Sequence, residues 1–243
     1  LILFFTMRKN KNINKIAGIK TLAIHHGATY SEETGCIMPP IFANSTFKYG
    51  NKGNFDYTRS GNPNFKILEN VLKRIENAKY CTVFSSGIAA VTAITSSLKT
   101  GDKILCESNL YGCTIRMFEK VFKKFGIETY YYDFTSKESL KIISKVNPAL
   151  IWLESPTNPL LKILNLKEIC KEANSKNIPV VVDNTFCTPI IQNPIELGAT
   201  LSLISTTKFI NGHSDALGGA VLTDNEYWSE KMIFAQKSLG LNP

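Results

Sequence analysis

From residue 63 onward, short runs of β-branched and apolar residues alternate with longer segments whose apolar residues recur at helical spacing. This alternation predicts β-α-β units and a mostly parallel sheet with helices on its faces, because parallel neighbours need a long crossover connection. In the first helical segment, which follows Asn62 and Pro63, Leu68, Leu72 and Ile75 share one apolar face. The fold class is therefore α/β. We expect about seven strands, with helices such as 115–125 and 166–176 between most of them, at residues 80–84, 104–107, 128–133, 150–154, 180–183, 201–204 and 220–223.

Two of these strands lead directly into residues that are typical of a functional site. In open α/β sheets the ligand lies outside the carboxyl ends of the strands. The apolar strand 180–183 ends in Asp183, and a buried carboxylate is costly unless it meets a cation or caps a helix. The strand 201–204 leads into the hydroxyl residues 205–207 and then Lys208. A lone lysine usually lies on the solvated surface of a protein. The position of Lys208 at a strand end is what suggests a function.

The strand 80–84 leads into Ser85, Ser86 and Gly87, and a helical stretch begins directly afterwards at Ile88. The unpaired N–H groups and the positive dipole end of such a helix favour a bound phosphate. An ordinary serine N-cap would explain the same residues. The turn therefore points to phosphate binding only in combination with the other two strand ends.

Together these positions meet the three requirements of pyridoxal 5'-phosphate (PLP), which are a lysine for the aldehyde, an anion for the pyridine nitrogen and donors for the phosphate. Tyr111, which follows the strand 104–107, adds an aromatic face. The motifs of other cofactors are missing, namely GxGxxG after a strand, the P-loop and HExxH. The six cysteines form no CxxC pair and no zinc-ligand spacing, so we predict reduced thiols and no metal site.

The net charge of +8 is concentrated at the N-terminus, where the first twenty residues hold five basic residues and no acid. The remaining lysines are interspersed with Glu and Asp, whereas a nucleic-acid surface needs a basic stripe with interleaved aromatics. The apolar stretch 1–7 is too short to span a bilayer, and its charge order is the reverse of a secretory signal. We therefore expect a cytoplasmic protein with no nucleic-acid or membrane partner, whose natural start is Leu1 or Met7.

Six phrases of the chain, in this order, resemble the PLP-dependent enzymes of cysteine and methionine metabolism. That family includes cystathionine γ-synthases, cystathionine and methionine γ-lyases, and O-acetylhomoserine sulfhydrylases. The phrases are 57–63 (YTRSGNP), 86–87 (SG), 110–114 (LYGCT), 154–159 (ESPTNP), 183–186 (DNTF) and 205–215 (STTKFINGHSD). The resemblance implies the large, PLP-binding domain of the fold type I enzymes for residues 61–243. For residues 1–60 it implies an extended N-terminal arm that contributes to the active site of a dimer partner.

The resemblance also implies roles for individual residues. Lys208 would be the Schiff-base lysine, Asp183 would face the pyridine nitrogen and Tyr111 would stack on the ring, which makes these three the candidate catalytic residues. Asn158 would lie near the phenolic oxygen of PLP. The phosphate would be surrounded by Ser86, Gly87, Ile88, Ser205 and Thr207, and by Tyr57 and Arg59 from the neighbouring subunit. A homodimer or homotetramer with shared active sites follows.

The phrases at 57–63 and 211–215 are most like the γ-synthase and γ-lyase branch. We predict a cystathionine γ-synthase, which joins an O-acylated homoserine to cysteine, and small amino acids as the substrates. Cystathionine γ-lyase, methionine γ-lyase and O-acetylhomoserine sulfhydrylase stay open as alternatives, and Cys113 resembles the methionine γ-lyases. Members of the family continue into a C-terminal domain with an arginine for the substrate carboxylate, and we expect that domain to be absent here. The alternative of another class is therefore a fragment that binds PLP or dimerises without turnover.

Overall fold

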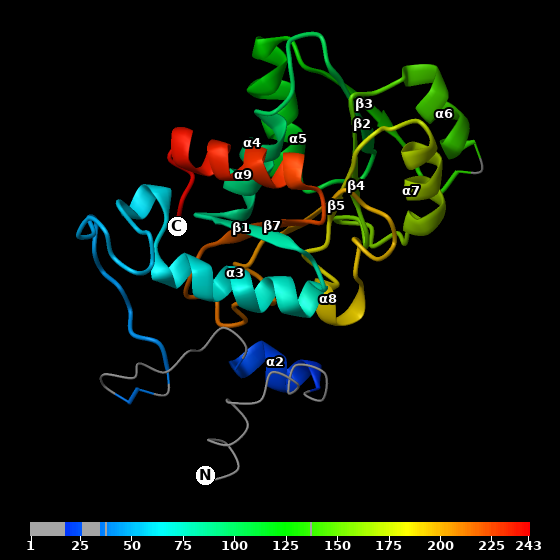
Figure 1. The fold of residues 1–243 in the computed structure, drawn as a ribbon. Helices are drawn as coiled ribbons and strands as arrows, with labels where there is room; N and C mark the ends of the chain where they lie inside the picture. The colour runs from blue at the N-terminus through cyan, green and yellow to red at the C-terminus, as the bar shows by residue number, and fades with distance from the viewer. Residues whose placement is uncertain (1–17, 26–34, 37, 137) are drawn as a thin grey trace.

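The computed structural model of the 243-residue chain describes residues 18–25, 35–36, 38–136 and 138–243. Its centre is a seven-stranded sheet with the strand order β1-β7-β6-β5-β4-β2-β3 (Figure 1). Strands β2 to β6 run parallel, whereas β7 is antiparallel to both of its neighbours, β1 and β6. The predicted mostly parallel α/β sheet is confirmed. The strands are β1 (Tyr80–Phe84), β2 (Lys103–Glu107), β3 (Glu128–Tyr132), β4 (Leu150–Glu154), β5 (Val180–Asp183), β6 (Leu201–Ile204) and β7 (Gly219–Thr223).

Helices cover both faces of the sheet. The first face is covered by α4 (Gly87–Thr95), α5 (Gly112–Lys120) and α9 (Glu226–Ser238), which pack on a cluster that includes Trp152 and Leu203 (Figure 1). The second face is covered by α3 (Pro63–Glu76), α6 (Ser139–Val146), α7 (Leu166–Ser175) and the short α8 (Thr188–Ile191). Outside these layers lie α2 (Ile19–His25), which contacts α3, and the 3-10 turns η2 (Thr58–Ser60) and η3 (Phe122–Phe125).

The middle strands are buried on both faces, as parallel strands between two helix layers are expected to be. Every residue of β4, β5 and β6 is buried. Trp152 of β4 meets Phe118 of α5 edge-on, with 5.2 Å between the ring centroids, and both side chains are fully buried. This core fixes the positions at which the strands end, and therefore the positions of the residues that follow them.

Several predicted boundaries were wrong. The helix predicted at 115–125 is α5, which begins at Gly112 and ends at Lys120, followed by η3. It starts early because Tyr111 turns the chain, and the tighter η3 ends at Gly126, whose positive φ closes the turn. The strand predicted at 128–133 stops at Tyr132, because the carboxylate of Asp133 accepts the N–H of Thr135 and turns the chain. The helix predicted at 166–176 ends at Ser175, and the strands predicted from 104 and 220 each begin one residue earlier.

The predicted N-terminal arm is only partly described. Residues 38–57 form little regular structure apart from a bridge between Thr46 and Tyr57, which fits an extended segment. The helix α2 was not expected. Residues 1–17, 26–34 and 37, including Met7 as a possible start, lie outside the described residues. The division into an arm and a large domain stays a prediction.

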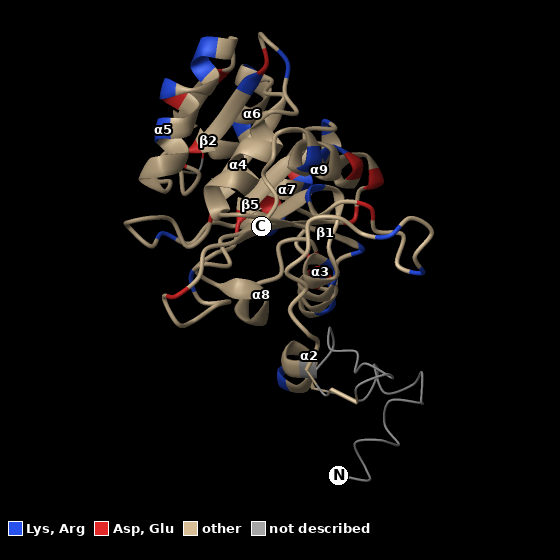
Figure 2. Ribbon diagram, turned by 90° about the vertical axis from the view of Figure 1, so that its left-hand side faces the viewer, with Lys and Arg blue, Asp and Glu red and all other residues tan. Residues whose placement is uncertain are grey.

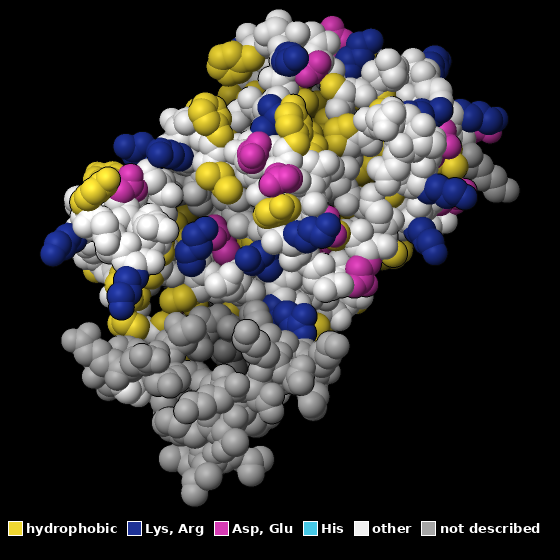
Figure 3. All heavy atoms as spheres, in the orientation of Figure 1, with side chains coloured by type: hydrophobic (Ala, Val, Ile, Leu, Met, Phe, Trp, Pro, Cys, Tyr) yellow, Lys and Arg dark blue, Asp and Glu magenta, His cyan; other side chains and the backbone are white. Residues whose placement is uncertain are grey.

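Charged residues lie mainly on the helices and connecting loops (Figure 2). On the face drawn in Figure 3, Lys and Arg side chains are scattered among Asp and Glu side chains rather than gathered in one band. Within the part of the chain that the structure describes, no helix has the length and apolar character needed to cross a membrane. Cys106 and Cys170 are fully buried in β2 and α7.

Glu76, the last residue of α3, is fully buried. Among the described residues neither of its carboxylate oxygens has a hydrogen-bond partner. The pKa of Glu76 is raised to about 8. Burial is the main cause and the charge of Glu196 adds to it, while the nearby Ser202 hydroxyl partly opposes the increase. In the folded protein this carboxyl therefore stays protonated at pH values at which the unfolded chain, with a pKa of 4.5, has released the proton.

We expect the Glu76→Gln variant to lose less stability than the wild type as the pH rises from 5 to 9. The raised pKa means that the wild type loses stability as pH rises from 4.5 to about 8 and changes little above that. The loss is on the order of a few kcal/mol, and glutamine has no proton to release. Free energies of unfolding measured at pH 5, 7 and 9 should therefore fall more steeply in the wild type. The exposed Glu230→Gln is the control, and parallel pH profiles of wild type and Glu76→Gln would contradict the prediction.

Candidate active site

Five of the loops that leave the strands carry predicted site residues, and the sheet places all five at one edge. Because β1, β2, β4, β5 and β6 all point the same way, their carboxyl ends meet there. The antiparallel β7 starts at that same edge, with Gly219 paired to Phe84. The structure thereby brings together loops that are up to 120 residues apart in sequence, after Phe84, Glu107, Glu154, Asp183 and Ile204.

The turn after β1 touches the turn after β6. A Cβ atom on Gly87 would lie 2.8 Å from the Cβ atom of Ser205 and 2.9 Å from its hydroxyl, so the two turns can approach this closely only with glycine at 87. Ser86 caps α4, because its hydroxyl accepts the N–H of Ala89 at 3.1 Å. The N-cap interpretation is therefore confirmed. It does not exclude a bound anion, because the N–H groups of Gly87 and Ile88 belong to the first turn of α4 and have no acceptor within the helix. This donor set suits a phosphate.

The turn after β6 is held by backbone and hydroxyl hydrogen bonds. The N–H of Ser205 donates to the Thr185 hydroxyl at 2.8 Å, and the N–H of Lys208 donates to the Ser205 carbonyl at 3.2 Å. The Thr207 hydroxyl donates to the carbonyl of Gly218 at 3.1 Å and accepts its N–H at 3.0 Å, so it is already engaged. The side chain of Lys208 is exposed at the edge of the sheet.

Asp183 is fixed by a residue that the sequence analysis missed. Oδ1 of Asp183 accepts the N–H of Thr185 at 3.0 Å and its hydroxyl at 2.6 Å. The same hydroxyl accepts from Ser205, so Thr185 links the carboxylate to the turn that carries Lys208. An Asp followed two residues later by Thr is a common turn pattern, and this was the available signal.

Glu154 was missed as well. It is paired with Asp183 in the register of β4 and β5, and the two side chains are 5% and 8% exposed. Burial and then the charge of Asp183 raise the pKa of Glu154 to about 8, and burial also raises the pKa of Asp183. The available signal was in the sequence, because the apolar strand at 150–154 ends in an acid just as the strand at 180–183 does.

These two carboxyl groups provide a test of whether the site suits PLP. In the part of the chain that the structure describes, neither Asp183 nor Glu154 takes part in a salt bridge. A buried anion without a cation is unfavourable. A positively charged group that binds at this edge of the sheet would therefore be stabilised by the carboxyl groups. A protonated pyridine nitrogen is such a group, and with the Gly87 turn and Lys208 the residues fit the cofactor.

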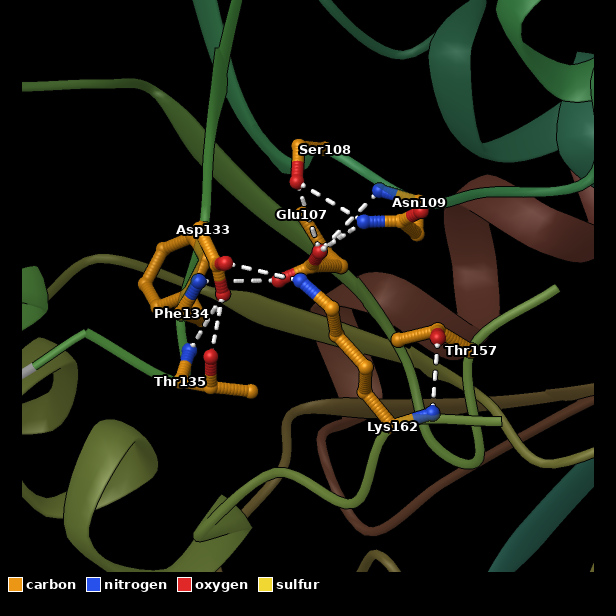
Figure 4. Close-up of polar contacts among 8 residues, drawn as sticks. All are labelled: Glu107, Ser108, Asn109, Asp133, Phe134, Thr135, Thr157 and Lys162. Carbon is orange, nitrogen blue, oxygen red and sulfur yellow. Dashed lines mark hydrogen bonds and ion pairs between the residues drawn. The ribbon is translucent and has the colours of Figure 1, made fainter. Parts of the chain in front are cut away.

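The loop after β4 carries Asn158. Hydrogen bonds between Thr157 and Lys162 join the two ends of this loop (Figure 4). Thr157 and Lys162 bond to each other through the Thr157 N–H and the Lys162 carbonyl at 3.0 Å, and through the Lys162 N–H and the Thr157 hydroxyl at 3.0 Å. The Lys162 ammonium lies 2.7 Å from Asp133, and with the Thr135 donors it holds the pKa of Asp133 at about 2. Asn158 is half-buried at the start of this anchored loop.

Tyr111 lies at the start of α5 and is 44% exposed. A hydrogen bond with Cys113 raises the pKa of the Tyr111 hydroxyl. Tyr57 and Arg59 lie elsewhere: the Arg59 guanidinium sits 5.5 Å from the centre of the Tyr57 ring and donates to the Lys237 carbonyl of α9 at 3.3 Å. The contacts among described residues do not join this pair to Ser86, Gly87 or Ser205 of the same chain. No set of three or more His, Cys, Asp or Glu in the described part could hold a metal ion.

A sequence model of the family described as Cys/Met metabolism PLP-dependent enzyme matches residues 20–243. A probable cystathionine gamma-synthase from Herpetosiphon aurantiacus is 40% identical over 93% of this chain and 72% of the relative. A cystathionine gamma-lyase from Dictyostelium discoideum is 39% identical over 93% of this chain and 59% of the relative. A cystathionine beta-lyase from Lactococcus lactis subsp. cremoris is 38% identical over 93% of this chain and 60% of the relative.

A crystal structure titled as metB from Corynebacterium glutamicum superposes on this chain with a TM-score of 0.90 and 39% sequence identity. The match covers 95% of this chain and 61% of that one. The chain thus spans about three fifths of the length of most of these relatives.

Proposed function

Because the chain belongs to the family of Cys/Met-metabolism PLP-dependent enzymes, we propose that it is the cofactor-binding part of an enzyme that makes or breaks a carbon–sulfur bond in an amino acid. One observation carries the proposal: a lysine, a buried carboxylate and a turn rich in N–H donors converge at one edge of the sheet. Lys208, Asp183 and Gly87 represent these three groups. Each strand end alone has an ordinary explanation, but their convergence matches the chemistry of PLP.

In this proposal each side chain has a role that its position supports. When bound, PLP supplies an electron-withdrawing ring for the electrons released at the substrate Cα. Asp183 holds a proton at the pyridine nitrogen, and Thr185 keeps that carboxylate in place. The Lys208 amine would hold the cofactor through its aldehyde and would serve as the base that moves protons at Cα and then Cβ of the substrate. Tyr111 would cover the ring and assist proton transfer.

The remaining site residues bind and orient. The N–H groups of Gly87 and Ile88, with Ser86 and Ser205, bind the phosphate, while Thr207 contributes through the turn that it closes with Gly218. Asn158 would lie near the phenolic oxygen of bound PLP. Tyr57 and Arg59 act on the phosphate of a neighbouring subunit, which requires a homodimer or homotetramer. A cytoplasmic location and small amino-acid substrates belong to the same proposal.

Among the possible reactions we favour that of a cystathionine γ-synthase. In it the Cγ–O bond of an O-acylated homoserine breaks, the acyl group leaves as a carboxylate, and the cysteine sulfur forms a bond to Cγ. A relative named as a probable cystathionine gamma-synthase supports this choice. The gamma-lyase and beta-lyase relatives are almost equally similar, and the sequence analysis had not considered the beta-lyase reaction. Methionine γ-lyase, O-acetylhomoserine sulfhydrylase and a fragment without turnover stay open.

Product analysis of the full-length protein with PLP separates these reactions. With an O-acylated homoserine and cysteine, we expect cystathionine to form, and with cystathionine alone we expect much slower release of keto acid. Rapid release of cysteine, 2-oxobutanoate and ammonia from cystathionine would favour the γ-lyase instead, whereas homocysteine, pyruvate and ammonia would favour the β-lyase. A protein that binds PLP and turns over none of these substrates would contradict the proposed function.

A further inference from the structure

Glu154 has no assigned role in the proposed reaction, yet it lies between two groups that do. It is the last residue of β4 and stands beside Asp183, the last residue of β5. Both side chains project to the same face of the sheet as Trp152 and Val181, which pack under α4, α5 and α9. Glu154 therefore lies beside Asp183 and faces α5, at whose start Tyr111 lies.

Glu154 makes one specific contact. Its Oε2 atom accepts the backbone N–H of Tyr111 at 2.8 Å, across 43 positions of sequence. Tyr111 is the N-cap residue of α5, with φ −52° and ψ 127°, and its own side chain makes no cap hydrogen bond. A carboxyl group from the neighbouring strand thus takes up an N–H group at the point where α5 begins, next to the positive end of the helix dipole. This contact holds the backbone of Tyr111 at the start of α5.

The two carboxyl groups are not equivalent. Asp183 accepts two hydrogen bonds from Thr185, which stabilise its charged form. Burial and then the neighbouring charge of Asp183 raise the pKa of Glu154 to about 8, and burial raises the pKa of Asp183 as well. Glu154 is therefore the acceptor for the Tyr111 N–H group, whereas Asp183 is engaged by Thr185.

We propose that Glu154 is a positioning residue, which acts on the cofactor by holding the Tyr111 backbone through a hydrogen-bond acceptor and not as a second anion. The inference rests on the proposed function, since it assumes that Tyr111 covers a bound PLP ring. The proposal predicts that PLP binding depends on the length of the Glu154 side chain and not on its acidity. Two single substitutions separate these properties.

Glu154→Gln keeps the length and the carbonyl acceptor but removes the acid. Glu154→Asp keeps the acid beside Asp183 but, being one methylene shorter, withdraws the acceptor from the Tyr111 N–H. We expect Glu154→Gln to bind PLP within about threefold of the wild type and to give the same visible circular dichroism of the bound cofactor. We expect Glu154→Asp to bind PLP about tenfold more weakly, as for one lost hydrogen bond to an ordered group, with an altered circular dichroism band.

Both readouts, the dissociation constant from a PLP titration and the visible circular dichroism, are taken on the full-length protein and need no turnover. Glu107→Gln is the matched control, because Glu107 is a fully buried acid at the end of β2 that bonds to Ser108, Asn109 and Phe134 instead. Melting temperatures establish that each variant is folded. Loss of affinity in Glu154→Gln, or wild-type affinity in Glu154→Asp, would overturn the inference. A wild type without any bound chromophore would overturn the cofactor assignment itself.

Discussion

Replacing Lys208 with alanine is expected to leave the protein colourless after incubation with PLP and to lower turnover of the full-length enzyme by about a thousandfold or more. The amine has two tasks in the proposed mechanism, binding the aldehyde and moving protons, and proton transfer alone is typically worth 10²–10⁴-fold. Because the side chain is exposed, its removal should leave the fold intact. We therefore expect Lys208→Ala to change cofactor binding and turnover but not the stability of the fold.

Absorption spectra with and without borohydride test this expectation. The wild type should show a Schiff-base band near ~420 nm that borohydride converts into a stable covalent adduct, and Lys208→Ala should show neither. Lys237→Ala, an exposed lysine of α9, is the control and should stay yellow. A reducible chromophore that survives in Lys208→Ala would show that another lysine binds the aldehyde.

The Asp183→Asn variant is expected to lose about a thousandfold in turnover while keeping its fold. An opposite charge about 4 Å away is worth roughly 4 kcal/mol at an effective dielectric near 20, or about three pKa units of the pyridine nitrogen. Asparagine has nearly the same shape and can still accept the Thr185 N–H bond. It lacks only the charge that keeps a proton on the ring, so the rate should fall by the corresponding factor of about 10³.

The same substitution is expected to leave the melting temperature of the cofactor-free protein equal or higher, because it removes one of two adjacent buried acids. In Asp183→Asn the turnover is therefore expected to fall while the melting temperature does not. Asp224→Asn, an exposed residue beyond the far end of β7, is the control. Retention of full activity in Asp183→Asn would rule out this carboxylate as the partner of the pyridine nitrogen.

Much of the fold could be predicted from the sequence, because the necessary signals are local. A strand such as 150–154 is recognised by its apolar run, and α3 by the spacing of its apolar residues after Pro63. The candidate residues Asp183 and Lys208 could be picked out for a related reason. Once the strands are parallel, whatever follows a strand lies at the same edge. Helix ends were less predictable, because Tyr111 and Gly126 set them through turns whose geometry a periodic pattern does not encode.

The sequence by itself determined the composition of the site: a lysine, a carboxylate and a glycine turn, each at a strand end. The tertiary structure alone decided which of these groups are neighbours. The pairing of Glu154 with Asp183 depends on β4 lying beside β5, and the contact of Gly87 with Ser205 depends on how closely the turns after β1 and β6 approach. The antiparallel direction of β7 was also decided only by the tertiary structure. The physical reason is that the hydrogen-bonding partner of a strand and the partners of a buried charge come from distant parts of the chain, whereas sequence patterns report only nearby residues.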